Sequence, residues 1–567
     1  FFAYLEGKFI TQEEVLDVMG DLVHRSEKLK GSTLVLDGYT GFTPVQLKAL
    51  GKLLSVCADV FVTVTLAPGE DPYQLGSPHR LFYLSKQTVH RLCKLAKETG
   101  ISWEEYWITE KEQQRQGRFA QNPPLAYLEK HIFRYGSRPY TPLSKDPAEG
   151  EKGRHQHSVF IQACLNPGEE MEEIAARIRS LVRREGYRYR DFAVITGDME
   201  VYAPAAGRAF AKYGIPCFLD QKQSLLLNPF VEYIRASVDM AVENFSYESV
   251  FRMLRCGLAD VEEEALDRLE NYVIARGIRG LAKWQEEWVR SYRGEDPQEV
   301  VELNQVKAGL LENWLPFAQA MKTKDASVRD YARALYEYIA GGRIQEKLKQ
   351  LEEQFAREGD LSRHKEYSQI YPLVMDLLDK LVDILGEERV SIREFKEILD
   401  AGLSEARVGI VPPAPDQVLV GDMERTRLKD IRILFFAGVN EGKIPKEEKA
   451  GKILSDLNRE ELEKPLQERG LSLAPTAKEA LYTQKFYLYM NLTKPRDRIY
   501  LTYSRLSGSG EALSPSYLIA QTERLFPDAA ERERELLAES PEAALEYLSL
   551  NLRADTEEDP VFAEVFS

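Results

Sequence analysis

Two arginines that flank a threonine are the residues of this sequence whose types and spacing best suit contact with a phosphate backbone. They lie in Asp422–Lys429, which reads DMERTRLK. Arginines neutralise phosphates, and a hydroxyl can add a hydrogen bond. Because Arg425 and Arg427 are two residues apart, they would lie on one side of an extended segment. Together with Thr426 they are the first candidates for contact with nucleic acid. The alternative is a solvated run of charges.

The loop Tyr39–Pro44 (YTGFTP) is a second candidate, because it places an aromatic ring beside hydroxyl groups. It follows an expected strand, Thr33–Leu36, and ligands of open parallel sheets usually bind just outside the carboxyl ends of the strands. Phe42 could then stack on a base, and Thr43 could bond a phosphate or a base edge. The alternative is that Phe42 packs on the helix that follows.

Three more cations, Lys494, Arg496 and Arg498, are weaker candidates for binding nucleic acid. Acidic residues near Arg496 and Arg498 could pair with both arginines and neutralise them. No catalytic residue and no metal ligand is assigned anywhere in the chain.

These residues must be positioned by strands and helices, and the hydrophobic pattern predicts an α/β fold. Residues 33–36 and 60–66 are expected strands separated by an amphipathic helix, a spacing typical of a βαβ unit in a parallel sheet. A second α/β block begins near residue 157, and YGIPCFLD reads as an edge-like strand within it. Further strands are expected on both sides of the basic segment Asp422–Lys429 and directly after Arg496.

Residues 225–410 differ, because long helical patterns replace the strands. Ile344, Leu348, Leu351 and Phe355 form one apolar stripe, and a second stripe ends at Gly386. The tryptophans of this stretch, Trp284, Trp288 and Trp314, are expected in the core rather than on a base-stacking surface. A helical module therefore interrupts a parallel-sheet domain that resumes after it.

This pattern predicts five segments. Residues 1–150 form the carboxyl-terminal part of a first α/β domain with helical segments, and residues 155–225 begin a second such domain. Residues 226–412 form the helical insert, residues 413–515 complete the second domain, and residues 516–567 are a helical, acidic linker. The charged run 145–157 (KDPAEGEKGRHQH) is expected to join the two α/β domains.

Composition excludes several classes of protein. The 567 residues are 44% hydrophobic and 29% charged, as in ordinary globular proteins, and no apolar run is long enough to cross a membrane. The five cysteines are scattered, which favours a reducing, cytoplasmic setting over disulfides, zinc or iron–sulfur ligation. A net charge of −16 does not suggest a nucleic-acid binder, although it leaves room for a local basic groove.

The order of these blocks resembles superfamily 1 helicases of the UvrD type, in which two RecA-like domains each carry a helical insert. The segments LVLDGYTGFTP, DFAVITGDMEVYAPAAGRAFAKYGIPCFLD, QVLVGDMERTRLKDIRILFFAGVNEGKIP and LTYSRLSGSGEALSPSYLI are similar to the B subunit of the bacterial AddAB (RexAB) helicase–nuclease. The resemblance covers nearly the whole chain, which we interpret as the central piece of such a protein, cut at both ends.

Three positions differ from a working motor of this kind. Gly38 follows Asp37 where the motor has a second carboxylate to orient water, and Gly197 stands where an arginine contacts nucleotide. Lys494 replaces another arginine, and lysine lacks the planar two-pronged guanidinium contact. No Gly-Lys pair is followed by Ser or Thr, so the phosphate loop is absent too. We therefore expect a degenerate nucleotide site in an inactivated motor fold.

The resemblance implies a DNA-scanning role. An AddA-type motor protein would be the partner, and this chain would channel single-stranded DNA from a processed duplex end and scan it for a Chi sequence. No cofactor is expected within the chain itself. ATP with magnesium, and the iron–sulfur cluster of a carboxyl-terminal nuclease domain, would belong to segments that this sequence does not contain.

Two other classes of function stay open. The chain could be a working ATP-driven helicase truncated before its phosphate loop, although Gly38, Gly197 and Lys494 argue against that. It could also be a protein–protein assembly module without DNA contact, which its acidic charge would suit.

Overall fold

The chain forms two compact units in its computed structural model. The sheet unit consists of Phe1–Asp220 and Pro415–Ser567, and the helical unit is Gln221–Ala414. The structure describes residues 14–107, 119, 121–134, 136–141, 158–220, 223–290, 297–405, 407–408, 416–446, 455–467, 473, 476–527, 529 and 539–551. The expected linker 145–157 lies outside these residues.

A six-stranded sheet with all neighbours parallel forms the centre of the sheet unit. Its strand order is β3-β10-β9-β4-β8-β5, so the edge position expected for the YGIPCFLD strand is confirmed. The strands are β3 (Val159–Cys164), β4 (Phe192–Thr196), β5 (Cys217–Leu219), β8 (Val418–Asp422), β9 (Ile433–Ala437) and β10 (Arg498–Ser504).

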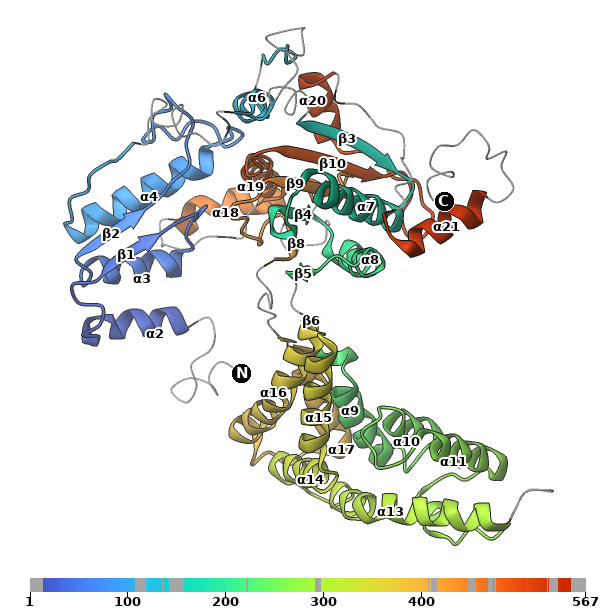
Figure 1. Ribbon diagram of the computed structural model, residues 1–567. Coiled ribbons are helices and arrows are strands. Elements are labelled where there is room, and N and C mark those ends of the chain that lie inside the picture. The colour runs from blue at the N-terminus through green and yellow to red at the C-terminus, as the bar shows by residue number, and fades with distance from the viewer. Residues whose placement is uncertain are drawn as a thin grey trace. The chain divides into compact units, whose positions relative to one another are not determined.

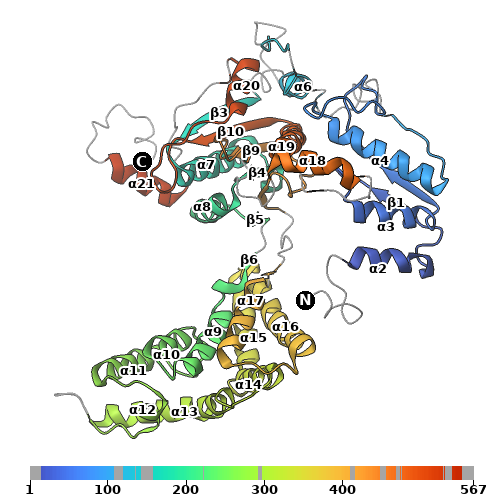
Figure 2. The same ribbon diagram turned by 180° about the vertical axis from the view of Figure 1, so that it is seen from behind.

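Helices cover both faces of this sheet. Alternate residues of β4 point to opposite faces, so Phe192 and Val194 join one core while Ala193 and Ile195 join the other. Figure 1 shows α7 (Pro167–Glu185) and α8 (Met199–Lys212) over the first face. Seen from behind in Figure 2, α19 (Ala477–Leu492) lies over the other face. The result is a three-layer α/β arrangement with two hydrophobic cores.

Side-chain caps define where the covering helices begin. The Asn166 side chain accepts a hydrogen bond from the Glu169 backbone N–H, and α7 ends at Gly186 in the left-handed conformation. Thr476 and Glu479 form a capping box at the start of α19. The other helices of this part are α18 (Asp456–Gln467), α20 (Tyr517–Leu525), α21 (Pro541–Asn551) and the 3-10 helix η3 (Tyr189–Asp191).

A separate two-stranded parallel sheet lies nearer the amino terminus of the chain. It pairs β1 (Thr33–Leu36) with β2 (Asp59–Val62), so the expected βαβ unit and its first strand are confirmed. The second strand ends at Val62 rather than at residue 66, because β1 ends opposite Val62 and leaves no partner beyond it. The helices of this amino-terminal part are α2 (Val15–Leu22), η1 (Val23–Arg25), α3 (Pro44–Leu54), α4 (Tyr83–Thr99) and α6 (Pro123–His131). Leu125 and Leu128 of α6 are buried in the core of the six-stranded sheet.

The helical unit has its own core, in which Trp284, Trp288 and Trp314 are all buried, as expected. The predicted stripe through Ile344 and Leu348 also faces this core. Two short strands, β6 (Gln223–Ser224) and β7 (Arg407–Val408), pair antiparallel. Its helices are η4 (Leu225–Leu227), α9 (Pro229–Val242), α10 (Tyr247–Leu254), α11 (Glu263–Arg276), α12 (Leu281–Gln285), α13 (Pro297–Met321), α14 (Val328–Gly341), α15 (Ile344–Glu358), α16 (Leu361–Leu385) and α17 (Ile392–Glu405).

None of the helices within the described ranges combines the length and the apolar character that crossing a membrane requires.

Candidate nucleic-acid interface

The basic segment Asp422–Lys429 is a crossover rather than a simple turn between neighbouring strands. It leaves the end of β8 and leads to β9, yet β4 lies between those two strands in the sheet. Met423 and Leu428 are buried in the core on the α19 face. Burial alternates along the segment, so Arg425 and Arg427 are exposed while Thr426 and Leu428 point inward. The two arginines therefore present their charges to solvent together.

Thr426 serves the fold of this segment. It is buried, and its hydroxyl donates to the Asp220 carboxylate at 2.7 Å. It also packs against Gly421, where an added Cβ would lie 2.1 Å from the Thr426 hydroxyl oxygen. Thr426 thus joins the ends of β5 and β8 and is not exposed to a ligand.

The Arg425 side chain makes one recorded hydrogen bond within the described residues, and the Arg427 side chain makes none. The Arg425 Nη2 atom donates to the backbone oxygen of Asp220 at 3.3 Å. Among the residues that the structure describes, no hydrogen bond or ion pair is recorded for the Arg427 guanidinium. Both guanidinium groups keep donors for phosphate oxygens.

The loop after β1 makes a tight turn at Asp37 and Gly38. The Gly38 N–H donates to the Thr63 hydroxyl at 3.3 Å, and that hydroxyl donates to the Asp37 carboxylate. Gly38 has a φ of +73°, a left-handed conformation that costs a side-chain-bearing residue about 1–2 kcal/mol. The turn therefore disfavours a glutamate at position 38.

Phe42 is buried within its own loop. Only 6% of its surface is exposed, and its ring stacks on Tyr39 with the centroids 5.1 Å apart. Arg91 donates to the Phe42 backbone oxygen at 3.2 Å and helps to hold the loop. Burial of the Phe42 ring leaves little of it accessible for stacking on a base. Tyr39, 44% exposed, is the ring of this loop that faces solvent.

Thr43 is the N-cap of α3. Its hydroxyl accepts from the Gln46 N–H at 3.3 Å, and the Gln46 side chain accepts from the Thr43 N–H at 2.9 Å. A Thr-Pro-x-Gln sequence is itself a signature of a capping box with proline at N1, so this role could have been found from the sequence.

This loop yields a prediction that separates the two rings. Phe42→Ala should lower the free energy of unfolding by about 2 kcal/mol, because a buried ring is lost from a loop that can partly collapse. Tyr39→Ala should cost less, about 1 kcal/mol or below, since its ring is 44% exposed and loses mainly its stack on Phe42. Thermal melts of both variants measure this difference. Equal melting temperatures would contradict the assignment of Phe42 to the loop core.

Gly197, at the end of β4, has no room for a side chain. A Cβ atom there would lie 2.5 Å from the Lys443 backbone oxygen and 3.0 Å from the Ile444 side chain. The loop after β9 occupies this place, and the Lys443 Nζ atom donates to the Asp198 carboxylate at 2.6 Å. An arginine at position 197 would require the backbone near Lys443 to move.

Arg496 and Arg498 are paired with acids, the possibility that made them weak candidates. Arg498 makes two hydrogen bonds to Glu185, at 2.9 and 2.7 Å, and Arg496 contacts Asp430 at 2.9 Å. Lys494 is half-buried just beyond the end of α19. These two arginines support the sheet unit rather than offering free charge.

Helix α19 contacts three of the loops described above. The Tyr487 hydroxyl lies 3.0 Å from the Thr40 hydroxyl of the loop after β1. The Asn491 side chain donates to the Met423 backbone oxygen at 2.7 Å, at the start of the basic crossover. The Gln484 side chain accepts from the Lys446 N–H at 2.5 Å, in the loop that fills the space beside Gly197. Three loops are therefore held by one helix.

A buried carboxyl group, Glu170, was not anticipated from the sequence. It accepts from the Gly438 N–H at 2.7 Å and from three hydroxyls, those of Thr502 at 2.5 Å, Ser504 at 2.6 Å and Tyr202 at 2.7 Å. Complete burial raises the pKa of Glu170. Because it lies four residues before Ile174, on the apolar stripe of α7, the pattern contained a signal for its burial.

The described residues do not fit a metal or a cluster. No group of three His, Cys, Asp or Glu side chains in this part of the chain could hold a metal ion. All five cysteines are free thiols, and only Cys164 is buried. Nothing in the described geometry therefore suits an iron–sulfur cluster.

Comparison with known proteins identifies the relatives of this chain. Residues 1–129 match the family described as "ADDB, N-terminal". The chain is 39% identical, over 99% of its length, to the B subunit of the ATP-dependent helicase/deoxyribonuclease of Lachnoclostridium phytofermentans. It is 33% identical over its whole length to the protein of the same name in Pelotomaculum thermopropionicum, and 32% identical over 99% to that of a Thermoanaerobacter species.

The chain spans about half the length of these curated relatives, namely 48%, 49% and 47%. The resemblance inferred from the sequence motifs is therefore confirmed: over nearly its whole length the chain is similar to the B subunit of the AddAB-type ATP-dependent helicase/deoxyribonuclease.

Proposed function

We propose that this chain is the non-motor core of the B subunit of a helicase–nuclease that acts on broken DNA ends during recombinational repair. Its α/β parts would be RecA-like domains of superfamily 1 type, and the helical unit would correspond to an inserted 2B-like domain. The core channels single-stranded DNA from a processed duplex and scans it for Chi. An AddA-type motor protein in the cytoplasm is the proposed partner and supplies the translocation.

The lack of room for a side chain at Gly197 is the main observation that supports a non-motor core. A motor needs a guanidinium at the end of this strand, and here the Cβ atom of such a residue would lie only 2.5 Å from the Lys443 backbone oxygen. The left-handed turn at Gly38 likewise disfavours the second carboxylate. Both features are properties of the backbone, so restoring either function would take more than a change of side chain. They favour a retained shape over a working motor truncated before its phosphate loop.

The exposed pair Arg425 and Arg427 supports DNA contact over a purely structural role. The two guanidinium groups emerge side by side from a crossover in which Met423, Thr426 and Leu428 are buried. ATP with magnesium and the cluster of a nuclease domain are proposed to belong to other segments of the protein, since the described residues offer no place for a metal.

Binding of a labelled single-stranded oligonucleotide across a salt series tests this role. In Arg425→Ala/Arg427→Ala, the slope of log affinity against log salt should shrink by about 1–2, because two phosphate contacts are lost. Fluorescence anisotropy measures this slope. Stability should change little, since both side chains are exposed.

The matched control is Arg188→Ala/Arg190→Ala. These two arginines have the same spacing and are also exposed, but they precede β4. They therefore lie at the amino-terminal end of the strands, opposite the end at which β8 leads into the basic segment. The control should keep the slope of the unaltered chain. An equal loss in both variants would reduce the effect to bulk charge and contradict the proposed channel, as would an unchanged slope in Arg425→Ala/Arg427→Ala.

A further inference from the structure

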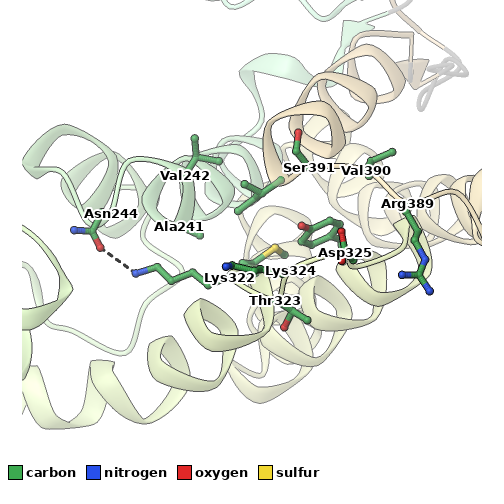
Figure 3. Close-up of a pocket in the computed structure, with 13 residues that line it drawn as sticks. Ala241, Val242, Asn244, Lys322, Thr323, Lys324, Asp325, Arg389, Val390 and Ser391 are labelled. Carbon is green, nitrogen blue, oxygen red and sulfur yellow. Dashed lines mark hydrogen bonds between the residues drawn. The ribbon is translucent and has the colours of Figure 1, made fainter.

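The helical unit contains a hollow of about 670 Å³ where three of its interhelical loops meet. The loops connect α9 to α10, α13 to α14, and α16 to α17. Figure 3 shows the side chains that line it. The sequence motifs gave no indication of this site, because its residues come from three distant segments.

Backbone hydrogen bonds fix two of these loops to each other. The Val328 N–H donates to the Glu388 oxygen at 3.0 Å, and the Val390 N–H donates to the Ala326 oxygen at 3.3 Å. Below them, Met321 and Tyr331 are buried in the core of the unit. The hollow is therefore part of the ordered fold: buried core residues form its base, and backbone hydrogen bonds hold two of the loops that surround it.

The polar lining is mainly basic. Lys322, Lys324 and Arg389 line the hollow and are exposed, and Asp325 is the carboxylate among the lining residues. The Lys322 ammonium donates to the neutral Asn244 side chain at 3.0 Å. Within the described ranges, no ion pair with an acid is recorded for any of these three cations.

Their lack of acidic partners contrasts with other arginines of the same unit. Arg252 pairs with Glu232 at 2.6 Å, and Arg329 pairs with Glu387 at 3.0 Å although both of the latter residues are exposed. In a chain of net charge −16, acids are plentiful, so three unpaired cations around one hollow leave a local positive potential. Such a potential attracts an anionic ligand.

The arrangement of the cations indicates what kind of anion. In Figure 3, Lys322 reaches toward Asn244 at one end of the hollow, and Arg389 lies at the other end. The charges are spread along the hollow instead of converging on one point. A single phosphate ion would need convergent donors, whereas a nucleic-acid backbone presents successive phosphates to a row of cations.

We propose that this hollow binds the phosphate backbone of DNA, as a second contact surface besides the Arg425 crossover. The inference rests on the proposed DNA-channelling function, because it assumes that DNA is the polyanion that reaches the helical unit. The contact is independent of base sequence, since it involves charge and backbone only.

The test removes the three cations together in the 567-residue chain. Lys322→Ala/Lys324→Ala/Arg389→Ala should weaken binding of a labelled oligonucleotide about tenfold or more at low salt and reduce the salt slope by about 2. The matched control is Arg279→Ala/Arg333→Ala/Lys349→Ala, which removes three exposed cations of the same unit that do not line the hollow. It should keep nearly full affinity, and thermal melts should show both variants folded.

Each outcome decides between the proposals. Equal losses in the hollow variant and its control, or no loss in the hollow variant, overturn this inference. If the hollow variant loses affinity for the oligonucleotide while Arg425→Ala/Arg427→Ala binds like the unaltered chain, the hollow is supported as a DNA contact. The proposed contact at Arg425 and Arg427 is then contradicted. A polyglutamate probe tests the other class of partner: if it binds as tightly as DNA and needs the same three cations, the occupant is an acidic protein segment and the DNA proposal fails.

Discussion

Glu170→Ala is expected to destabilise the sheet unit by about 3–5 kcal/mol, because it leaves four buried donors without their shared acceptor. The carboxylate joins α7 to the ends of β9 and β10 and to α8, through Gly438, Thr502, Ser504 and Tyr202. The three hydroxyls can partly satisfy one another, but the Gly438 N–H cannot turn. Hydrogen exchange of peptides from α7 and β10 measures the loss locally, without contribution from the helical unit.

Glu170→Gln is the matched variant that preserves the shape. Its amide oxygen can accept from Gly438 and Thr502, while its amide nitrogen donates to the hydroxyl oxygens of Tyr202 and Ser504. The protection of its α7 and β10 peptides against hydrogen exchange should stay close to that of the unaltered chain. If the alanine and glutamine variants exchanged equally fast, the hydrogen bonds of Glu170 would not be the source of its contribution.

The unaltered chain and Glu170→Gln should also differ in their dependence on pH. Burial raises the pKa of Glu170 above its ordinary value of 4.5, so the protonated form suits the folded state better. Stability from this group is therefore fully present below 4.5 and is lost as the pH rises through the higher folded-state pKa. Relative to Glu170→Gln, the unaltered chain should lose protection against hydrogen exchange as the pH rises from 4.5 toward that higher pKa. A constant difference would contradict this assignment.

Much of the fold follows from local pattern. Apolar runs bounded by turn residues predicted β1 and the edge position of β5, and helical periodicity predicted the buried stripe through Ile344 and Leu348. These predictions succeed because a strand or helix buries a face that its own sequence specifies. Sheet order is different. That β4 lies between β8 and β9 depends on long-range pairing, so the sequence shows strands on both sides of the basic segment but not that this segment crosses over β4.

The same distinction between local pattern and long-range contacts separates the candidate contact residues that were placed correctly from those that were not. Alternation correctly placed Arg425 and Arg427 on one exposed side. Thr426 and Phe42 are buried because of partners far away in sequence or within a folded loop, namely Asp220 and Tyr39. No local pattern reveals such partners. The hollow in the helical unit is the extreme case, since residues near 244, 322 and 389 meet only after the helices pack.

Gly197→Arg is the prediction that addresses the proposed loss of motor chemistry most directly. The substitution introduces the arginine that the proposed likeness to a motor would place here, yet we expect a destabilisation of about 3 kcal/mol or more. The cause is steric: the Cβ would lie 2.5 Å from the Lys443 backbone oxygen, and backbone cannot rotate away as a side chain can. Gly197→Ala should therefore already show most of the effect in thermal melts.

Gly508→Ala is the control for Gly197, because a Cβ at Gly508 would meet nothing within 4 Å and its backbone needs no left-handed conformation. Gly508→Ala should have the same melting temperature as the unaltered chain. If Gly197→Arg were equally stable, the loop at Lys443 would have to move freely, and the space for a nucleotide-contacting arginine would still exist. Because the loop is held by the Lys443–Asp198 pair and by Gln484 of α19, we expect it to stay in place. The proposed loss of motor function would then depend on the position of the backbone at Lys443, which a single side-chain substitution does not change.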